Sequence, residues 1–110
     1  MTAKNASLDQ ALHKLLLSLK EKTREVLGDR LAAMVLSGSR ARGDSEPDSD
    51  IDVLIVHRGG ISREEKARLV EECCALCEDK VVVFTYSTEE AWHTWCTPFL
   101  ENVRREGIEL

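Results

Sequence analysis

The chain lacks any apolar run that approaches the ~20 residues needed to cross a membrane. Its start, Met1 to Asn5, also lacks the continuous apolar segment of a signal peptide, so we expect a cytoplasmic protein without membrane association. Basic residues are not in excess, and the formal net charge of -5 argues against stable binding to duplex nucleic acid. Repeats, low-complexity tracts and linkers are absent as well. A chain of 110 residues therefore predicts one domain spanning 1–110.

The cysteines lack the companions that a zinc site requires. Cys73, Cys74 and Cys77 fall together on a predicted helix, and Cys96 stands apart from them. No second C-x-x-C or H-x-x-x-H follows, which disfavours zinc. We expect free thiols that pack as small hydrophobic side chains.

What the sequence does contain is a close succession of periodic segments. Hydrophobic residues make up 43% and charged residues 32%, as in a soluble globular domain. Apolar spacing and capping residues predict the order α-β-β-α-β-α. The predicted helices cover 7–27, 62–78 and 87–103, with Pro98 starting or bending the second half of the last one, and the predicted strands cover 31–36, 51–56 and 81–86.

Together these segments predict an α/β (α+β) fold, a small mixed sheet flanked by helices. The polar segment 37–49 is too short to hold a crossover helix, so the first two strands are expected to be antiparallel neighbours. Capping boxes are predicted at Ser7, Ser62 and Ser87. The inward-facing side chains expected on the middle helix are Leu69, Val70, Cys73, Cys74 and Cys77.

The segment 38–52 carries the chemistry. Gly38 and Ser39 leave a buried strand, and a glycine lets backbone amides approach a ligand closely while serine adds a hydroxyl donor. Arg40 and Arg42 place positive charge beside them, and guanidinium groups pair well with phosphate oxygens. These residue types in this order predict a site for a triphosphate.

Two carboxylates follow at the start of the second strand. Asp50 and Asp52 are two residues apart, so their side chains project from the same face. Two carboxylates this close repel each other, and this repulsion costs stability unless a cation between them offsets it. Mg²⁺ suits this position because it prefers carboxylate and phosphate oxygens. The combination predicts a metal-bridged nucleoside triphosphate that an incoming hydroxyl attacks in line. An Asp-x-Asp after a polar turn also occurs as a plain solvated strand edge.

The segment resembles the signature of the DNA polymerase beta-like nucleotidyltransferase superfamily, which is Gly-Ser, ten residues and Asp-x-Asp. The fuller string Gly-Ser-x-Ala-Arg-Gly, followed by Ser-Asp-x-Asp, resembles the minimal branch of that superfamily. The resemblance implies the nucleotidyltransferase fold, with Gly38 and Ser39 on the triphosphate and Asp50 and Asp52 as catalytic ligands of Mg²⁺. Arg42 and Ser49 lie in the same motif. Arg42 is expected to steady phosphate or brace the loop, and Ser49 to order the turn.

One group that the family usually supplies is missing. A third carboxylate is expected on the neighbouring strand, where it often acts as the base, but 81–86 contains no acid and Val82 is expected at that position. A positioned base typically contributes about 10²–10⁴-fold to rate. The absence bears on catalytic strength more than on nucleotide or metal binding.

Side chains outside the motif are expected to be structural. His57, at the end of the second strand, is expected near the edge of the site. His13 and His93 lie on predicted helices, and all three histidines are expected to be surface or boundary residues rather than catalysts. Trp92, Trp95 and Phe99 recur at helical spacing, which is typical of core packing, and an exposed part of them could be a partner surface.

Three functions compete at this point. The minimal branch resembles antitoxins paired with HEPN-type toxins, which implies an enzyme that transfers AMP from Mg-ATP to a hydroxyl of that protein partner. The alternative is a weak or inactive nucleotide-binding module that neutralises or regulates a partner by contact. The third is a structural subunit with an incidental Asp-x-Asp. Edge strands and aromatic helix faces make a homo-oligomer plausible.

Overall fold

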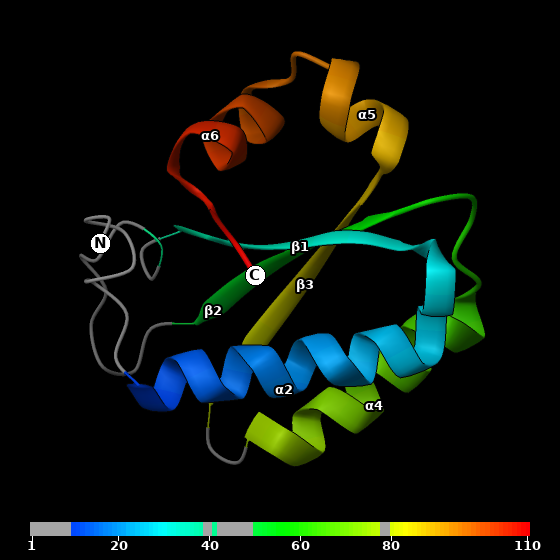
Figure 1. Ribbon diagram of the computed structural model, residues 1–110, viewed down its shortest axis with the longest axis vertical. Coiled ribbons are helices and arrows are strands. Elements are labelled where there is room, and N and C mark those ends of the chain that lie inside the picture. The colour runs from blue at the N-terminus through cyan, green and yellow to red at the C-terminus, as the bar shows by residue number, and fades with distance from the viewer. Residues whose placement is uncertain (1–9, 39–40, 42–49, 78–79) are drawn as a thin grey trace.

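A computed structural model describes residues 10–38, 41, 50–77 and 80–110, and these form a mixed α/β fold (Figure 1). The elements are α2 (Gln10–Leu27), the 3₁₀ turn η1 (Gly28–Arg30), β1 (Leu31–Ser37), β2 (Ile51–His57), α4 (Arg63–Cys77), β3 (Val82–Thr88), α5 (Glu89–Thr94), α6 (Pro98–Glu106) and β4 (Ile108–Glu109). In this part of the chain, no helix combines the length and the apolar character of a membrane span.

The strands form a four-stranded mixed sheet in the order β3-β2-β1-β4. β1 and β2 pair antiparallel, which confirms the expectation from their short connection. β2 and β3 pair parallel because the chain crosses between them through α4. β4 was not predicted: its two residues pair with Val35 and Leu36 of β1, and so short a segment carries no alternating pattern.

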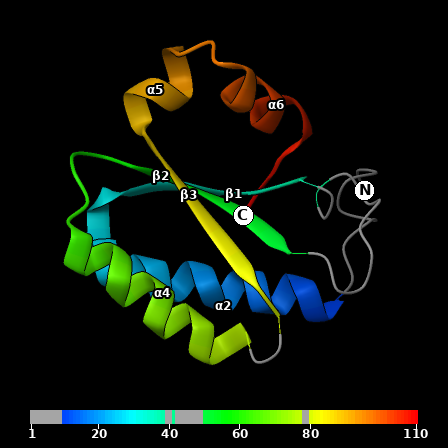
Figure 2. The same cartoon turned by 180° about the vertical axis from the view of Figure 1, so that it is seen from behind.

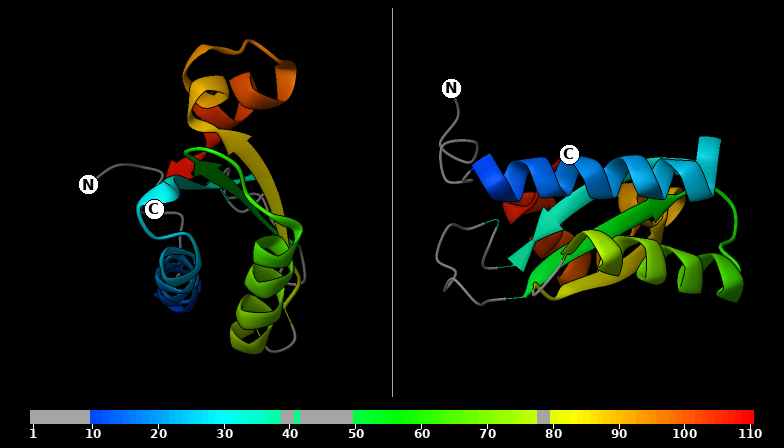
Figure 3. Two further views of the ribbon diagram at one scale, coloured as in Figure 1. Left: turned by 90° about the vertical axis from the view of Figure 1, so that its right-hand side faces the viewer. Right: turned by 90° about the horizontal axis from the view of Figure 1, so that it is seen from below.

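Helices cover both faces of the sheet. Figures 1 and 2 show α2 and α4 side by side on one face, with α5 and α6 on the other, and the edge-on view in Figure 3 agrees. Alternation along β2 serves both layers: Ile51, Val53 and Ile55 join the α2/α4 core cluster, whereas Leu54 and Val56 join the α5/α6 cluster. All five are fully buried. The strand therefore reads as a continuous apolar run from Val53 to Val56, after Asp52.

The α2/α4 layer follows the sequence expectation in part. Leu69, Cys73 and Cys77 are buried on α4, but Val70 is 46% exposed and Cys74 is exposed. The prediction that these two residues face inward was wrong, because only one narrow stripe of α4 meets α2 and the sheet. The four thiols are free.

Helix starts were predicted with mixed success. At α4 the capping box is confirmed: Glu65 N–H donates to Ser62 Oγ (3.1 Å), and Ser62 N–H donates to Glu65 Oε1 (3.0 Å). At α5 the predicted cap Ser87 was wrong, because β3 extends through Thr88 and the Thr88 hydroxyl accepts from Ala91 N–H. Ser7 lies outside the described residues.

The last predicted helix is two helices. α5 ends at Thr94, and α6 starts at Pro98, whose ring suits the first helical turn. Thr97 caps α6 by accepting from Leu100 N–H (3.2 Å). The expectation that Pro98 begins the second half is confirmed, and this break lets α6 turn back over the sheet.

Candidate functional site

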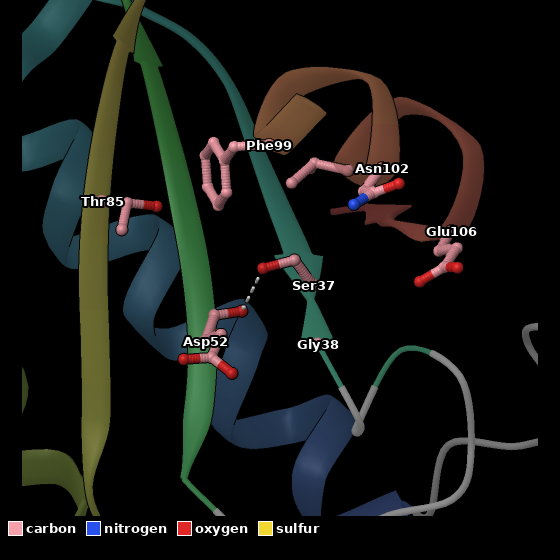
Figure 4. Close-up of a pocket in the computed structure, with 8 residues that line it drawn as sticks. Ser37, Gly38, Asp52, Thr85, Phe99, Asn102 and Glu106 are labelled. Carbon is pink, nitrogen blue, oxygen red and sulfur yellow. Dashed lines mark hydrogen bonds between the residues drawn. The ribbon is translucent and has the colours of Figure 1, made fainter. Parts of the chain in front are cut away.

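The site starts where β1 and β2 come together at one end of the sheet. Ser37, the last residue of β1, pairs with Asp52 of β2. The Ser37 hydroxyl donates a long hydrogen bond to the Asp52 backbone carbonyl (3.4 Å). Thr85 of β3 lies on the same side of the cavity, so three neighbouring strands contribute polar groups to one wall (Figure 4).

Gly38 lies directly against the carboxylate. Its φ of 72° is in the left-handed region, which side chains with a Cβ rarely adopt. A Cβ built on Gly38 would meet Asp52 Oδ2 at 2.5 Å. Both constraints favour glycine, so the chain brings bare backbone next to a carboxylate, an arrangement suited to a phosphate beside a metal.

Asp52 is the half-buried member of the carboxylate pair. Burial raises the pKa of Asp52, and the nearby charge of Asp50 raises it further. Asp50 is exposed and directly precedes β2. The pair is therefore electrostatically unfavourable without a cation.

The donor chemistry suits a hard divalent cation, because carboxylate oxygens are the ligands that Mg²⁺ prefers. Among the described residues, no group of three or more His, Cys, Asp or Glu side chains comes together to enclose a metal. An ion held by two carboxylates would keep positions for substrate oxygens. This arrangement fits Mg²⁺ that is bound jointly with a phosphate chain.

A cavity of about 320 Å³ opens beside Asp52. Its strand side consists of Ser37, Gly38, Asp52 and Thr85. Its helix side is contributed by α6 through Phe99, Asn102, Val103 and Glu106 (Figure 4). These four recur at intervals of three, one and three residues, which places them on one helix face. That spacing could be read in the sequence. Of these four residues, however, only Phe99 was singled out from the sequence, as part of the core packing or of a partner surface.

Arg104 holds this wall in position. Its guanidinium donates to the backbone carbonyls of Trp92 (2.7 Å), Ala91 (3.0 Å) and Trp95 (2.6 Å) at the end of α5. It also lies over the Trp92 ring, 5.5 Å from the centroid. The Ala91 carbonyl also accepts from Trp95 N–H (2.9 Å), whereas the last carbonyls of a helix generally lack intrahelical partners, so one cation supplements this helix end and fixes α6 against α5.

The structure brings part of the predicted site together. Gly38, Asp50 and Asp52 converge at one end of β1 and β2. The other predicted residues, Ser39, Arg40, Arg42 and Ser49, lie outside the described residues. Most of the predicted polar segment 37–49 does too, although Ala41 within it is buried in the α2/α4 core cluster.

His57 belongs elsewhere. It is buried at the far end of β2, five residues beyond Asp52 and so about 17 Å away by strand rise. Its Nδ1 lies 2.7 Å from the carbonyl oxygen of Gly59. The expectation that His57 lies near the edge of the site was wrong, and its role is in the turn between β2 and α4.

The strand register corrects the place of the missing carboxylate. Asp52 pairs with Val83, whereas Val82 pairs with Ile51 and packs against the α2/α4 core cluster. Val82 was expected at the position of the third carboxylate, but the β3 residue beside Asp52 is Val83. The expectation was wrong by one residue, and a shift of one residue along a strand moves the side chain to the opposite face of the sheet. Val83 lies beside Asp52 and is exposed. β3 has no acidic residue.

Comparison with known proteins gives a consistent picture. A family described as the nucleotidyltransferase domain matches residues 13–104. A proposed protein adenylyltransferase of Methanocaldococcus jannaschii is 33% identical over 91 residues, covering 83% of this chain and 90% of its own.

Solved structures share the fold. An enterococcal spectinomycin adenyltransferase, crystallised with ATP and spectinomycin, superposes with a TM-score of 0.66 at 18% identity, covering 78% of this chain and 38% of its own. A toxin–antitoxin structure with AMP-PNP has a TM-score of 0.60 at 18% identity, covering 84% of this chain and 69% of its own. Gly38, Asp50 and Asp52 all lie within the matched range 13–104.

Proposed function

Because the chain belongs to the nucleotidyltransferase domain family, we propose that this nucleotidyltransferase transfers AMP from Mg-ATP to a hydroxyl group of a protein partner. The observation that carries the proposal is the contact of Gly38 with Asp52 at the joined ends of β1 and β2. It places a position without a side chain, suited to phosphate, against a carboxylate that needs a cation.

Each site residue then has a proposed role. Asp50 and Asp52 hold Mg²⁺, and Gly38 with Ser39 receives the triphosphate. Arg42 steadies phosphate or braces the loop, and Ser49 orders the turn before the carboxylates. When bound, Mg²⁺ neutralises negative charge on the phosphates and on the pyrophosphate that leaves. Asp52, which is half-buried on β2, would fix the position of the Mg²⁺ relative to the phosphates.

Two findings support a protein as the acceptor. The Methanocaldococcus jannaschii relative, which this chain matches over 90% of its length, is a proposed protein adenylyltransferase. A structural neighbour is a toxin–antitoxin pair. The cavity of about 320 Å³ lies at the small end of ligand sites, roughly 300–1,000 Å³, and we propose that a second chain extends it. We propose a HEPN-type toxin as that chain, with this protein as its antitoxin.

One observation favours a second function. Val83, not an acid, lies beside Asp52, so no carboxylate from β3 is available to take the proton of the attacking hydroxyl. A chain that binds nucleotide without a strong base could regulate its partner by contact. The two functions differ in whether AMP becomes covalently attached to the partner.

The test is calorimetric titration with a non-hydrolysable ATP analogue, with and without Mg²⁺. The Asp50→Asn, Asp52→Asn double variant removes the proposed metal ligands, and circular dichroism checks its fold. Asp29→Asn, at the other end of β1, is the matched control for loss of an exposed carboxylate. We expect binding that depends on Mg²⁺ in the wild type and the control and is lost in the double variant. No binding by the wild type contradicts the proposed site.

Transfer is measured separately with ATP labelled on the α-phosphate. Label that appears on the partner and disappears with Asp52→Asn supports the enzyme. Partner binding without label, unaffected by Asp52→Asn, supports the regulatory module instead.

A further inference from the structure

The ring of Phe99 is left open to the cavity although Leu100 and Val103 of the same helix are buried. Phe99 is 48% exposed, whereas Leu100 and Val103 pack into the α5/α6 core cluster. Figure 4 shows the ring projecting from α6 over the strands, on the side of the cavity that faces Asp52 and Thr85. An exposed aromatic face in a ligand cavity offers a surface on which a flat ring can stack.

The charges of the cavity indicate which part of a nucleotide belongs there. Among the described residues that line it, the charged ones are the carboxylates Asp52 and Glu106, with no lysine, arginine or histidine. Glu106 would repel a phosphate chain from the α6 wall but not an uncharged nucleoside, whereas Asp52, on the strand side beside Gly38, is a proposed ligand of the Mg²⁺ that phosphates would share. The triphosphate therefore belongs at the Gly38 side, and the nucleoside below Phe99.

Asn102 adds a directed polar group. Its Oδ1 accepts a hydrogen bond from the guanidinium of Arg105 (2.7 Å), which sets the orientation of the amide. In Figure 4 the nitrogen of Asn102 points toward the cavity and the oxygen points away. The amide thus presents N–H donors to a ligand, and nucleobase edges carry nitrogen or oxygen acceptors.

We propose that Phe99 and Asn102 form a nucleobase subsite, in which the ring stacks on the base and the Asn102 amide donates to an acceptor on the base edge. The inference rests on the proposed function, because it assumes that the triphosphate lies at Gly38. It gives α6 a role in nucleotide selection that the motif in 38–52 does not supply.

The test compares two probes in the presence of Mg²⁺: the non-hydrolysable ATP analogue and inorganic tripolyphosphate, which has no base. Phe99→Ala should weaken binding of the ATP analogue about 10-fold or more, as loss of one base–aromatic stack does, and leave tripolyphosphate binding unchanged. Phe99→Tyr keeps the ring and should bind as the wild type. Asn102→Ala should weaken the analogue alone.

Trp95→Ala is the matched control, since Trp95 is also exposed (57%) on this side of the sheet but does not line the cavity beside Asp52. It should bind both probes as the wild type. An unchanged affinity of Phe99→Ala for the analogue overturns the subsite, and slower transfer to a protein acceptor in that variant would mark the ring as an acceptor contact instead. A wild type that binds tripolyphosphate as tightly as the analogue overturns the subsite alone, and one that binds neither overturns the proposed function with it.

Discussion

Gly38 and Asp52 approach each other so closely that a side chain at position 38 would have to displace the Asp52 carboxylate. The Cβ of any other residue would lie 2.5 Å from Asp52 Oδ2, and the φ of 72° would strain it as well. The steric contact and the backbone strain can be separated, because Gly59 has a similar left-handed φ but lacks the contact. Its φ is 67°, and a Cβ there would meet nothing within 4 Å.

Gly38→Ala is therefore expected to lose nucleotide binding as well as stability, whereas Gly59→Ala should lose stability alone. A left-handed conformation costs a residue with a Cβ about 1–2 kcal/mol, and both variants should lose about that much stability. Gly38→Ala should in addition displace the Asp52 carboxylate and abolish binding of the ATP analogue that depends on Mg²⁺. Urea unfolding and calorimetry measure the two effects. Equal nucleotide binding by both variants would show that the contact is unimportant.

Asp52→Asn should stabilise the metal-free protein. Burial and the charge of Asp50 hold the pKa of Asp52 above its ordinary value. Folding therefore favours the protonated form, and that contribution is lost as pH rises through the folded pKa. At pH 7 the ionised group opposes folding, so Asp52→Asn should raise the free energy of unfolding in EDTA, by less than about 1 kcal/mol because water screens a half-exposed site.

Added Mg²⁺ should reverse this order, since it stabilises only the chain that can bind it. Urea unfolding in EDTA and in Mg²⁺ gives the comparison, with Asp29→Asn as the control. A metal-free Asp52→Asn protein that is less stable than the wild type would contradict the prediction.

Glu65 should make stability fall in acid. The Arg30 guanidinium donates two hydrogen bonds to the Glu65 carboxylate, and these bonds tie η1 to α4. Ser62 N–H donates a third hydrogen bond to the same carboxylate. Arg30 foremost lowers the pKa of Glu65 from 4.5 to about 2. A lowered carboxylate pKa contributes stability that is present above the ordinary pKa and is lost as pH falls toward the folded one.

Glu65→Gln should therefore unfold at a lower temperature than the wild type at pH 7, and the difference should shrink between pH 4.5 and about 2. Thermal unfolding followed by circular dichroism measures it. Glu25→Gln, which removes an exposed pair with Lys22, should show little change at any pH. A difference for Glu65→Gln that does not vary with pH would exclude this carboxylate as its source.

Arg104 should matter to both stability and nucleotide binding. Arg104→Ala leaves the carbonyls of Ala91, Trp92 and Trp95 without this donor and is expected to cost about 1–3 kcal/mol. Arg104→Lys keeps the charge but loses the planar fork, so it should recover only part of that. Because α6 would shift, binding of the ATP analogue should weaken while tripolyphosphate binding persists. Arg68→Ala, which removes an exposed pair with Glu72, should stay within about 0.5 kcal/mol of the wild type.

The resemblance to the minimal nucleotidyltransferases, drawn from Gly38 through Asp52, is confirmed by the family match and by the similarity to a proposed protein adenylyltransferase. Elements with strong local patterns were also predictable. β1 and β2 are apolar runs between turn residues, and the cap at Ser62 satisfies amides a few residues away. The antiparallel pairing of β1 and β2 followed from the length of their connection, which is again a local quantity.

Contacts between distant segments decided the rest. β4 exists only because Ile108 and Glu109 meet β1 more than 70 residues away along the chain. The register of β3 against β2, which puts Val83 rather than Val82 beside Asp52, depends on how α4 packs. The α6 wall of the cavity depends on the guanidinium of Arg104 at the end of α5.

The sequence by itself thus determined most of the elements and the family motif in 38–52, for which the phosphate and metal chemistry is proposed, because periodicity, capping and charge spacing act within a few residues. Only the tertiary structure decided what faces that chemistry. Phe99, Asn102 and Glu106 reach the cavity because the break at Pro98 and the packing of Leu100 and Val103 turn α6 over the sheet, and side-chain burial between distant segments leaves no local pattern in the sequence.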